Sequence, residues 1–408
     1  MNRLSRRAFT LAALSAMSAL TAGAEAAPRH GGAPTAEMRG MWLATVLNRD
    51  WPSRPGLAPA VQRAQLLQQF DTAVRHGLNA VFFQVRPCAD ALWPSPYEPW
   101  SEYLTGTQGK NPGWDPLGTA VQEAHARGLQ LHAWFNPYRV AGHTDLSRLA
   151  ASHPARKHPD WVVAYDGKLF YNPGLPEVRA FVENAILDAV ARYPVDGVHF
   201  DDYFYPYPVA GQTFDDSAAY AAYGKGFANR AAWRRNNINL LVQESAARVR
   251  QTRPTARFGI SPFGVWRNVA TDAHGSATHA LQSYDDLYAD TRTWVKSGWL
   301  DYICPQLYWN IGFAPADYAE LVRWWAQVAQ GTRVRLYVGE ALYKAGDRTQ
   351  PAAWRNPAEL SQHLTLAKRY PQVGGHVFFA AKDVATDRIG AMARVLADHY
   401  THPAPAPL

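Results

Sequence analysis

The stretch DGVHFDDY, residues 196–203, decides the fold. Its apolar residues alternate with polar or small ones, which is typical of a β-strand with two different faces. A helical pattern over residues 176–193 precedes the stretch, and another over residues 230–253 follows it after a long loop. The stretch is therefore one strand of a repeating unit of strand, loop and helix.

The same unit recurs along the chain. The β-like runs are residues 38–46, 79–86, 129–136, 197–203, 257–263, 301–308, 333–339 and 375–381. The helix-like stretches are residues 61–76, 116–127, 176–193, 230–253, 284–297, 315–330, 357–368 and 386–399. Eight strands that are each followed by a helix predict a parallel (β/α)8 barrel, a TIM barrel of the α/β class. The alternative is a doubly wound open sheet, but no G-x-G-x-x-G motif follows the first strand.

The two kinds of connection between these elements differ in length. The links from helix to strand are short, whereas the links from strand to helix are long and rich in Trp, Tyr, Pro and Asn. In a barrel, all strand-to-helix loops emerge at the C-terminal ends of the strands, where barrel enzymes hold their active sites. We therefore expect a cleft with aromatic walls at this end.

Successive side chains of a strand point to opposite faces, so alternation assigns residues to the barrel interior. Five successive strands then end their interior row in a polar residue. These residues are Arg86, Asn136, Asp201, Ser261 and Gln306. A buried polar group without a hydrogen bond costs about 1–3 kcal/mol, so a ring of such groups predicts a functional site.

Three carboxylates are candidates for catalysis. Asp201 is the expected central group, held in its charged form by Arg86 opposite. Asp202 follows it, but strict alternation turns Asp202 towards the helices unless the strand has already ended, and its alternative role is to anchor the next loop. Glu340 follows the seventh strand on the same face as the outward-facing Val338. Glycoside cleavage needs a protonated acid beside the leaving oxygen and a carboxylate near the anomeric carbon, which favours glycosidase chemistry.

The composition also favours a sugar ligand, because the chain has 15 Trp and 20 Tyr. Flat amphipathic rings suit the apolar faces of sugars. The residues that we expect to bind substrate are Trp42, Gln84, Arg86, Trp93, Trp100, Asn136, Tyr138, His199, Tyr203, Tyr205, Ser261, Gln306, Tyr308 and Trp309.

Other chemistries fit the sequence less well. No G-x-S-x-G motif is present for acyl transfer, and His132 and His199 lie one layer too deep for a metal site of the barrel type. Cys88 and Cys304 fall on different sides of the barrel, so we expect no disulfide. The net charge of +7 comes without blocks of Lys and Arg, which is a weak argument for nucleic acid. We expect neither a metal nor another cofactor.

Residues 1–26 have the pattern of an export leader. Arg6 and Arg7 precede an apolar run, residues 8–22, that is too short for a stable membrane anchor. The stretch around the two arginines resembles the twin-arginine signal, and an ordinary Sec signal is the alternative. We expect an exported protein, periplasmic or secreted, without stable membrane insertion. The expected parts are the leader 1–26, a flexible spacer 27–37, a single barrel 38–400 and a Pro-rich tail 401–408.

Several motifs together resemble the bacterial glycosyl-hydrolase-like family ten. They are residues 38–42, 79–86, 133–138, 196–203 and 305–309. The resemblance covers nearly the whole chain after the leader. It implies a barrel glycosidase of the cell envelope, and one type of member acts on peptidoglycan strands stripped of their stem peptides. We therefore expect a polysaccharide as the partner, most specifically the peptide-free (denuded) peptidoglycan glycan strand.

The fourth strand is also similar to the D-G-x-D-x-D-x-E pattern of chitinase-like barrels. Asp196, Gly197 and Asp201 match it, but His199 and Tyr203 stand where the pattern has an Asp and the acidic Glu. The resemblance allows a substrate-assisted mechanism in which an N-acetyl group attacks the anomeric carbon. Two other functions stay open from the sequence, namely a glycan-binding barrel without catalysis and a hydrolase of another extracellular polysaccharide.

Overall fold

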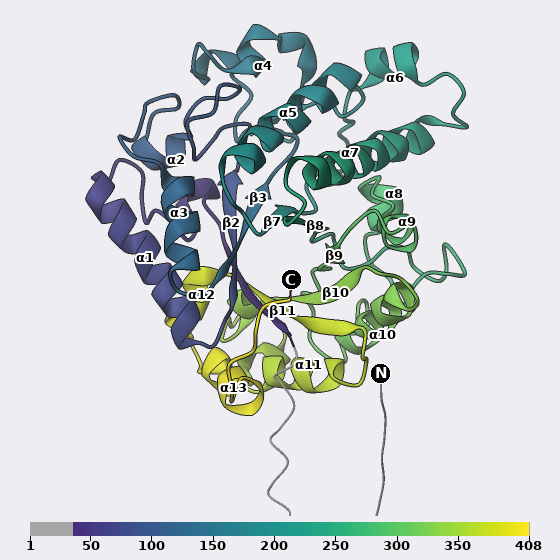
Figure 1. Ribbon diagram of the computed structural model, residues 1–408. Coiled ribbons are helices and arrows are strands. Elements are labelled where there is room, and N and C mark those ends of the chain that lie inside the picture. Colours follow the sequence, from purple (N-terminus) through teal and green to yellow (C-terminus); the bar gives the residue numbers. More distant parts are fainter. Residues whose placement is uncertain (1–35, 408) are drawn as a thin grey trace, which may run out of the picture. The chain divides into compact units, whose positions relative to one another are not determined.

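The computed structural model describes residues 36–407, which form a closed parallel barrel (Figure 1). Around the barrel the strand order is β1, β11, β10, β9, β8, β7, β3 and β2. The strand bounds are β1 (Met38–Leu43), β2 (Ala80–Arg86), β3 (Gln130–Phe135), β7 (Gly197–Phe200), β8 (Arg257–Ile260), β9 (Tyr302–Ile303), β10 (Arg335–Glu340) and β11 (Val373–Phe379). Because β1 pairs with both β2 and β11, the sheet has no free edge. The predicted (β/α)8 barrel is confirmed, and the open sheet is excluded.

Helices cover the outside of the barrel, as Figure 1 shows. The main ones are α1 (Pro59–Arg75), α3 (Pro116–His125), α5 (Pro176–Arg192), α7 (Arg230–Thr252), α9 (Thr291–Lys296), α10 (Tyr318–Ala329), α11 (Glu359–Ala367) and α13 (Ala391–His399). Local sequence fixes where they begin. Asp115 caps α3 by accepting a hydrogen bond from the backbone of Gly118, and Asn229 caps α7 in the same way through Ala232. The helix expected at 284–297 is broken into α8 (Ser283–Asp286) and α9.

The long loops contain structure that the sequence patterns did not predict. The loop after β3 holds a small antiparallel sheet of β4 (Arg139–Ala141), β6 (Lys168–Tyr171) and β5 (Val162–Tyr165). The other short helices of the loops are α2 (Glu102–Thr105), α4 (Pro154–Lys157), α6 (Ser217–Tyr223) and α12 (Ala381–Thr386). This extra sheet matters because its first residue, Arg139, reaches the mouth of the barrel.

A column of polar rings fills the barrel interior. The indole N–H of Trp42 donates to Nε2 of His199 over 3.1 Å, so the proton of this imidazole is on Nδ1, 3.0 Å from the hydroxyl of Tyr302. The same hydroxyl lies 3.0 Å from Nδ1 of His132, whose Nε2 is 3.2 Å from Oε1 of Gln130. Burial lowers the pKa of His132 to about 4 and that of His199 well below its usual value. Both histidines are therefore neutral members of a hydrogen-bonded core.

The segment expected to be a Pro-rich tail lies, as far as residue 407, against the N-terminal end of the barrel. The side chain of Arg39 donates to the carbonyl oxygen of His402 and that of Asn79 to the carbonyl oxygen of Ala404. The segment is thus bonded to residues at the end of the barrel opposite to the long strand-to-helix loops. The leader 1–26 and most of the spacer lie outside the described residues. Within residues 36–407 no helix combines the length and the apolar character needed to cross a membrane.

Candidate active site

A cavity of about 350 Å³ opens at the C-terminal ends of the strands. Eight of the residues expected at the site line it, namely Trp42, Gln84, Asp201, Asp202, Tyr203, Ser261, Gln306 and Tyr308. Asn136 and His199 lie directly behind this wall, because each is buried and bonded to a residue that lines the cavity. The two neighbouring carboxyl groups, Asp201 and Asp202, are the acidic residues among those that line it.

Asp201 is held by three N–H donors. Its Oδ2 accepts hydrogen bonds from the amide of Asn136 and, over 3.2 Å, from the indole of Trp134. Its Oδ1 accepts one from the backbone N–H of Tyr203 over 3.0 Å. None of these three groups can accept a hydrogen bond in return. The surroundings of Asp201 are therefore built for a carboxylate.

The orientation of the Asn136 amide follows from the backbone after β1. The N–H groups of Thr45 and Val46 both donate to Oε1 of Gln84, each over 2.9 Å. The other end of that amide, Nε2 of Gln84, must then donate to Oδ1 of Asn136, at 2.6 Å. Nδ2 of Asn136 is left to face Asp201. Two backbone N–H donors thus fix the orientation of both side-chain amides, that of Gln84 and that of Asn136.

Asp202 faces the cavity because β7 ends at Phe200, before strict alternation can turn Asp202 outwards. Oδ1 of Asp202 accepts a hydrogen bond from Nε2 of Gln306 over 2.9 Å. The same Nε2 donates to the backbone carbonyl of Ser261, which fixes the amide of Gln306 as a donor. Oδ2 of Asp202 is bonded to the hydroxyl of Tyr207. The sequence-based condition for Asp202 to belong to the site is therefore met.

The two carboxyl groups share a buried, crowded environment. Burial and the charge of Asp202 raise the pKa of Asp201 to about 7, against the lowering effect of Arg139, and burial also raises the pKa of Asp202. Because the groups interact, this titration belongs to the pair, which can hold one proton up to about pH 7. A hydroxyl can accept as well as donate, so Tyr207 can accept from a protonated Asp202, whereas no partner of Asp201 can. The proton is therefore better placed on Asp202.

Glu340, the third catalytic candidate, lies outside the cavity. It is fully buried on the helix side of β10 and accepts hydrogen bonds from the Tyr318 hydroxyl and from His363 and His376, at 2.7 to 2.9 Å. Burial alone would raise its pKa, but His363 and His376 lower it. The expected catalytic role is wrong. Glu340 lies two residues after Val338 on β10, so its side chain points to the same outer face of the barrel, where it forms a structural ion pair.

Arg86 also differs from the expectation. Its side chain is fully buried in an ion pair with Glu98, with Nε 2.7 Å from a carboxylate oxygen, and it donates to the carbonyl of Pro137. The register of β2 against β3 shifts between Gln84 and Arg86, so simple alternation fails at this point. Arg86 supports the loop after β3 and does not lie opposite Asp201 in the cavity.

Five aromatic residues expected to contact sugar do not line the cavity. Trp93, Tyr138 and Tyr205 are enclosed in the core, and the indole of Trp93 donates to Asp188 over 2.8 Å. For these three the expectation is wrong, because their rings fill the space beneath the long loops. Trp100 and Trp309 are half-buried against the core, and their contact with substrate stays a prediction.

The structure brings further residues to the cavity that the sequence patterns did not single out. They are Ala44, Val46, Arg49, Trp134, Arg139, Tyr207, Tyr343 and Phe379. Trp134 lies two residues before Asn136 in the third strand, so alternation also predicts that it faces the barrel interior. Arg139 and Tyr207 lie on loops whose paths no local pattern shows.

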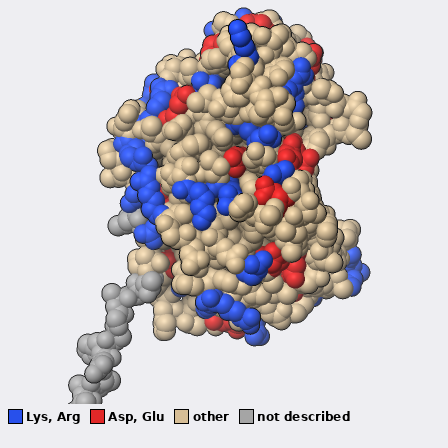
Figure 2. All heavy atoms as spheres, turned by 90° about the vertical axis from the view of Figure 1, so that its right-hand side faces the viewer, with Lys and Arg blue, Asp and Glu red and all other residues tan. Residues whose placement is uncertain are grey.

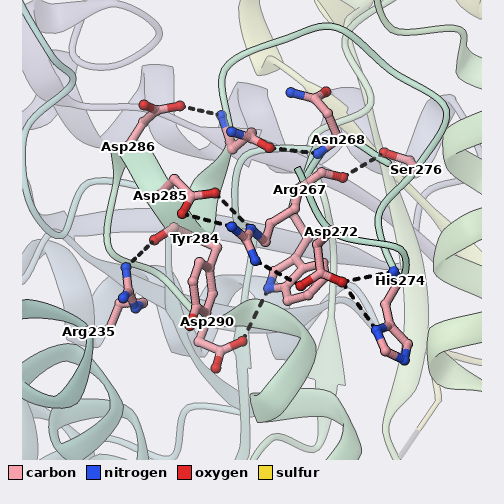
Figure 3. Close-up of polar contacts among 12 residues, drawn as sticks. Arg235, Arg267, Asn268, Asp272, His274, Ser276, Tyr284, Asp285, Asp286 and Asp290 are labelled. Carbon is pink, nitrogen blue, oxygen red and sulfur yellow. Dashed lines mark hydrogen bonds and ion pairs between the residues drawn. The ribbon is translucent and has the colours of Figure 1, made fainter. Parts of the chain in front are cut away.

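The long loop after β8 has its own ion-pair network, which Figure 3 shows. Arg267 points towards two carboxylates and binds each over 2.8 Å, Asp285 through Nε and Asp272 through Nη1. Across the same loop, the backbone N–H of Ser276 donates to the carbonyl oxygen of Arg267 over 2.9 Å. None of these residues lines the cavity, so this network stabilises the rim and does not contribute chemistry.

Within residues 36–407 no group of three or more His, Cys, Asp or Glu side chains is placed to hold a metal ion. The chemistry available in the cavity is that of two carboxyl groups with fixed hydrogen-bond donors and aromatic walls. A closed (β/α)8 barrel with such a pair at the C-terminal ends of its strands has the architecture of a barrel glycosidase.

The chain belongs to the glycosyl hydrolase-like 10 family, whose model matches residues 37–356. It is 48% identical over 374 residues to "Glycosyl hydrolase YngK" of Bacillus subtilis, covering 91% of this chain and 73% of that protein. It is 42% identical over 362 residues to "Glycosyl hydrolase DigH" of Escherichia coli K12, covering 84% of this chain and 82% of that protein. The family resemblance found in the motifs is confirmed.

Solved structures show the same fold. The glycoside hydrolase domain of PgaB (BpsB) from Bordetella bronchiseptica superposes with a TM-score of 0.58 at 13% identity, covering 90% of this chain and 99% of that one. The catalytic domain of β-amylase from Paenibacillus polymyxa superposes with a TM-score of 0.55 at 10% identity, covering 91% of this chain and 100% of that one. These similarities concern the barrel fold.

Proposed function

We propose that the protein is a glycoside hydrolase that cleaves peptide-free peptidoglycan strands in the cell envelope. The observation that carries the proposal is the pair Asp201 and Asp202 at the floor of the cavity, one held as an acceptor and the other able to hold a proton. The family membership and the relatives named glycosyl hydrolases support the reaction class. The leader pattern in residues 1–26 supports action outside the cytoplasm.

In the proposed mechanism, Asp202 is the general acid. Its proton passes to the glycosidic oxygen as the bond from that oxygen to the anomeric carbon breaks. Gln306 and Tyr207 hold the resulting carboxylate in place by their hydrogen bonds. A water molecule then attacks the anomeric carbon and returns its proton to Asp202, which restores the starting state.

Asp201 stays ionised and stabilises the positive charge that develops on the sugar. A carboxylate that already accepts three N–H hydrogen bonds is a poor nucleophile, so its position favours electrostatic and orienting work. The sugars of peptidoglycan carry N-acetyl groups, and the carbonyl oxygen of such a group can attack the anomeric carbon in place of the enzyme. The Asp201 carboxylate would then accept a hydrogen bond from the N–H of that N-acetyl group and stabilise the oxazolinium ion.

The surface of the barrel agrees with a negatively charged polymer as substrate. The formal net charge of the full chain is +7, and without residues 1–26, which carry three Arg and one Glu, it is +5. On the face in Figure 2, Lys and Arg side chains gather towards the left of the view, with Asp and Glu nearer the middle and right. A net positive charge raises the rate of encounter with polyanions.

The test is the release of new reducing ends from purified glycan strands whose stem peptides have been removed. Wild type should release them, and Asp202→Asn should bind the strands in a sedimentation assay but release none. Binding by the wild type without any release would identify a glycan-binding barrel and overturn the proposal. Faster release from chitin or from a neutral exopolysaccharide would assign the enzyme to another substrate.

A further inference from the structure

A second cavity, of about 420 Å³, adjoins the first. Four residues line both cavities, namely Val46, Arg139, Tyr203 and Tyr207. The two spaces are therefore parts of one cleft, divided by the side chains of these shared residues. A polymer bound at Asp201 and Asp202 can continue into the second cavity.

The second cavity has the lining of a sugar site. Tyr103 and Phe170 supply rings to its wall in addition to the shared Tyr203, whose side chain is 37% exposed. Aromatic rings with polar edges suit the mixed character of a pyranose ring. The charged residues in this wall decide which sugar it can hold.

Arg139 is a half-buried cation that makes no direct ion pair, although its charge acts on the nearby Asp201 carboxylate. Its Nε donates to the backbone carbonyl of Pro87 over 2.9 Å, and its guanidinium carbon lies 5.2 Å from the centre of the Tyr203 ring. Among the described residues no carboxylate lies within ion-pair distance of it. In contrast, Arg86 is paired with Glu98, as described above.

The same contrast holds elsewhere in the protein. Arg49 is paired with Asp50 and Asp383, and Arg234 with Asp216. Charged side chains that are drawn away from water are normally paired, because their desolvation is otherwise uncompensated. A half-buried guanidinium that is left unpaired in a binding cleft is the arrangement expected where the ligand supplies the anion.

We propose that Arg139 binds a carboxylate of the substrate and thereby selects glycan strands whose lactyl groups are free. This inference rests on the proposed function. The lactyl side chain of N-acetylmuramic acid ends in a carboxylate, but in intact peptidoglycan that group is joined to the stem peptide as a neutral amide. The charge that Arg139 requires therefore exists only after the peptide has been removed.

The inference also places the enzyme in a reaction order. A hydrolase that cleaves the amide bond between the lactyl group and the peptide must act first, since its reaction creates the carboxylate. Lys168, the other cation of the second cavity, is less suited to the role because it is already paired with Asp166.

The experiment compares two forms of one ligand. Peptide-free oligosaccharides are prepared with free lactyl carboxylates, and a portion is converted to methylamides, which removes the charge and adds little bulk. Their dissociation constants are measured by calorimetry in the Asp202→Asn background, where turnover does not interfere and the Asp201 charge beside Arg139 is kept. The free acid should bind at least about tenfold more tightly than the methylamide, the effect expected for one charge-assisted contact.

The variants then assign the effect to a residue. Arg139→Gln should weaken binding of the free acid and bind both forms equally, whereas Arg139→Lys should restore part of the preference. Lys168→Gln is the matched control, because it removes a paired charge from the same cavity, and it should keep the preference. Circular dichroism checks that each variant is folded, and Arg139→Lys keeps the test decisive if Arg139→Gln does not fold.

Each other outcome has a separate meaning. If the inactive protein with Arg139 and Lys168 unchanged binds the free acid and the methylamide equally, the role of Arg139 is overturned and the proposed function still stands. Loss of the preference in Lys168→Gln, with the preference kept in Arg139→Gln, would also overturn it. If neither ligand form binds and neither is cleaved by wild type, the proposed function itself fails.

Discussion

Replacing Asp201 with Asn tests whether this carboxylate serves the reaction or the fold. In the variant, the amide oxygen can keep the two hydrogen bonds now made at Oδ2, from Asn136 and Trp134. The amide NH2 then faces the backbone N–H of Tyr203, and this hydrogen bond is lost. An unsatisfied buried group costs about 1–3 kcal/mol, but removal of a buried charge next to Asp202 offsets part of that cost. We expect only a small change in the free energy of unfolding.

The effect on turnover should be much larger. The variant lacks the negative charge that stabilises the developing oxocarbenium or oxazolinium ion, and loss of such a group lowers the rate at least about a hundredfold, or roughly 2.7 kcal/mol. The assay is the release of reducing ends from peptide-free glycan by wild type and variant at equal folded concentration. Thermal denaturation measures stability in parallel. Retention of more than about a tenth of the wild-type rate would show that Asp201 is structural.

Glu340→Gln is the matched control for this experiment. It also removes the charge of a buried carboxylate near a strand end, but Glu340 lies outside the cavity in a cluster with His363 and His376. Breaking a buried ion pair leaves its partner uncompensated and costs about 3–5 kcal/mol of stability. The two variants should therefore show opposite patterns, with lost turnover at Asp201 and lost stability at Glu340.

Three further outcomes are expected. Trp93→Ala should lower the free energy of unfolding by about 3–5 kcal/mol in chemical denaturation, because the ring is enclosed in the core, and unchanged stability with weaker glycan binding would reverse that assignment. The pKa of Glu340 is lowered and that of His363 is raised by their pairing, so the stability that wild type has over His363→Asn should be greatest between about pH 4.5 and 6.5. It should decline as the pH rises through the raised pKa of His363 or falls through the lowered pKa of Glu340. A difference in denaturation midpoints that stays unchanged both well below pH 4.5 and well above pH 6.5 would contradict the pairing. Changing Arg6 and Arg7 to Lys should leave precursor in the cytoplasm, as fractionation would show, and normal export in a strain with only the Sec route would exclude the twin-arginine signal.

The barrel was predictable because its signals are local and repeated. Each strand carries a two-residue alternation and each helix a longer period, so the order of elements can be read without knowledge of distant contacts. The same alternation placed Asp201 and Gln306 correctly in the cavity. It failed at Arg86, where the strand register shifts, and left Asp202 open, because the end of β7 depends on how far its neighbours continue the ladder.

The aromatic residues show a second limit of sequence-based prediction. Composition correctly predicted aromatic walls, but Trp93 and Tyr205 lie in the core while Tyr207 and Phe379 line the cavity. All of these residues lie on loops or at strand ends with similar local patterns. Which ring faces the ligand depends on the path of the loop in three dimensions. Arg139 was missed for the same reason, since the small sheet that carries it has no counterpart in the strand–helix repeat.

The closure of the barrel has a consequence for how the protein is made. The first strand, β1, needs β11 as a neighbour, and the side chains of Arg39 and Asn79 are bonded to the segment after α13. A ribosome makes β1 early and these partners late, so the nascent chain carries an unpaired strand edge through nearly all of its synthesis. Such an edge can pair with another chain. Crowded polysomes should therefore favour aggregation, and slower initiation of translation should raise the yield of folded protein.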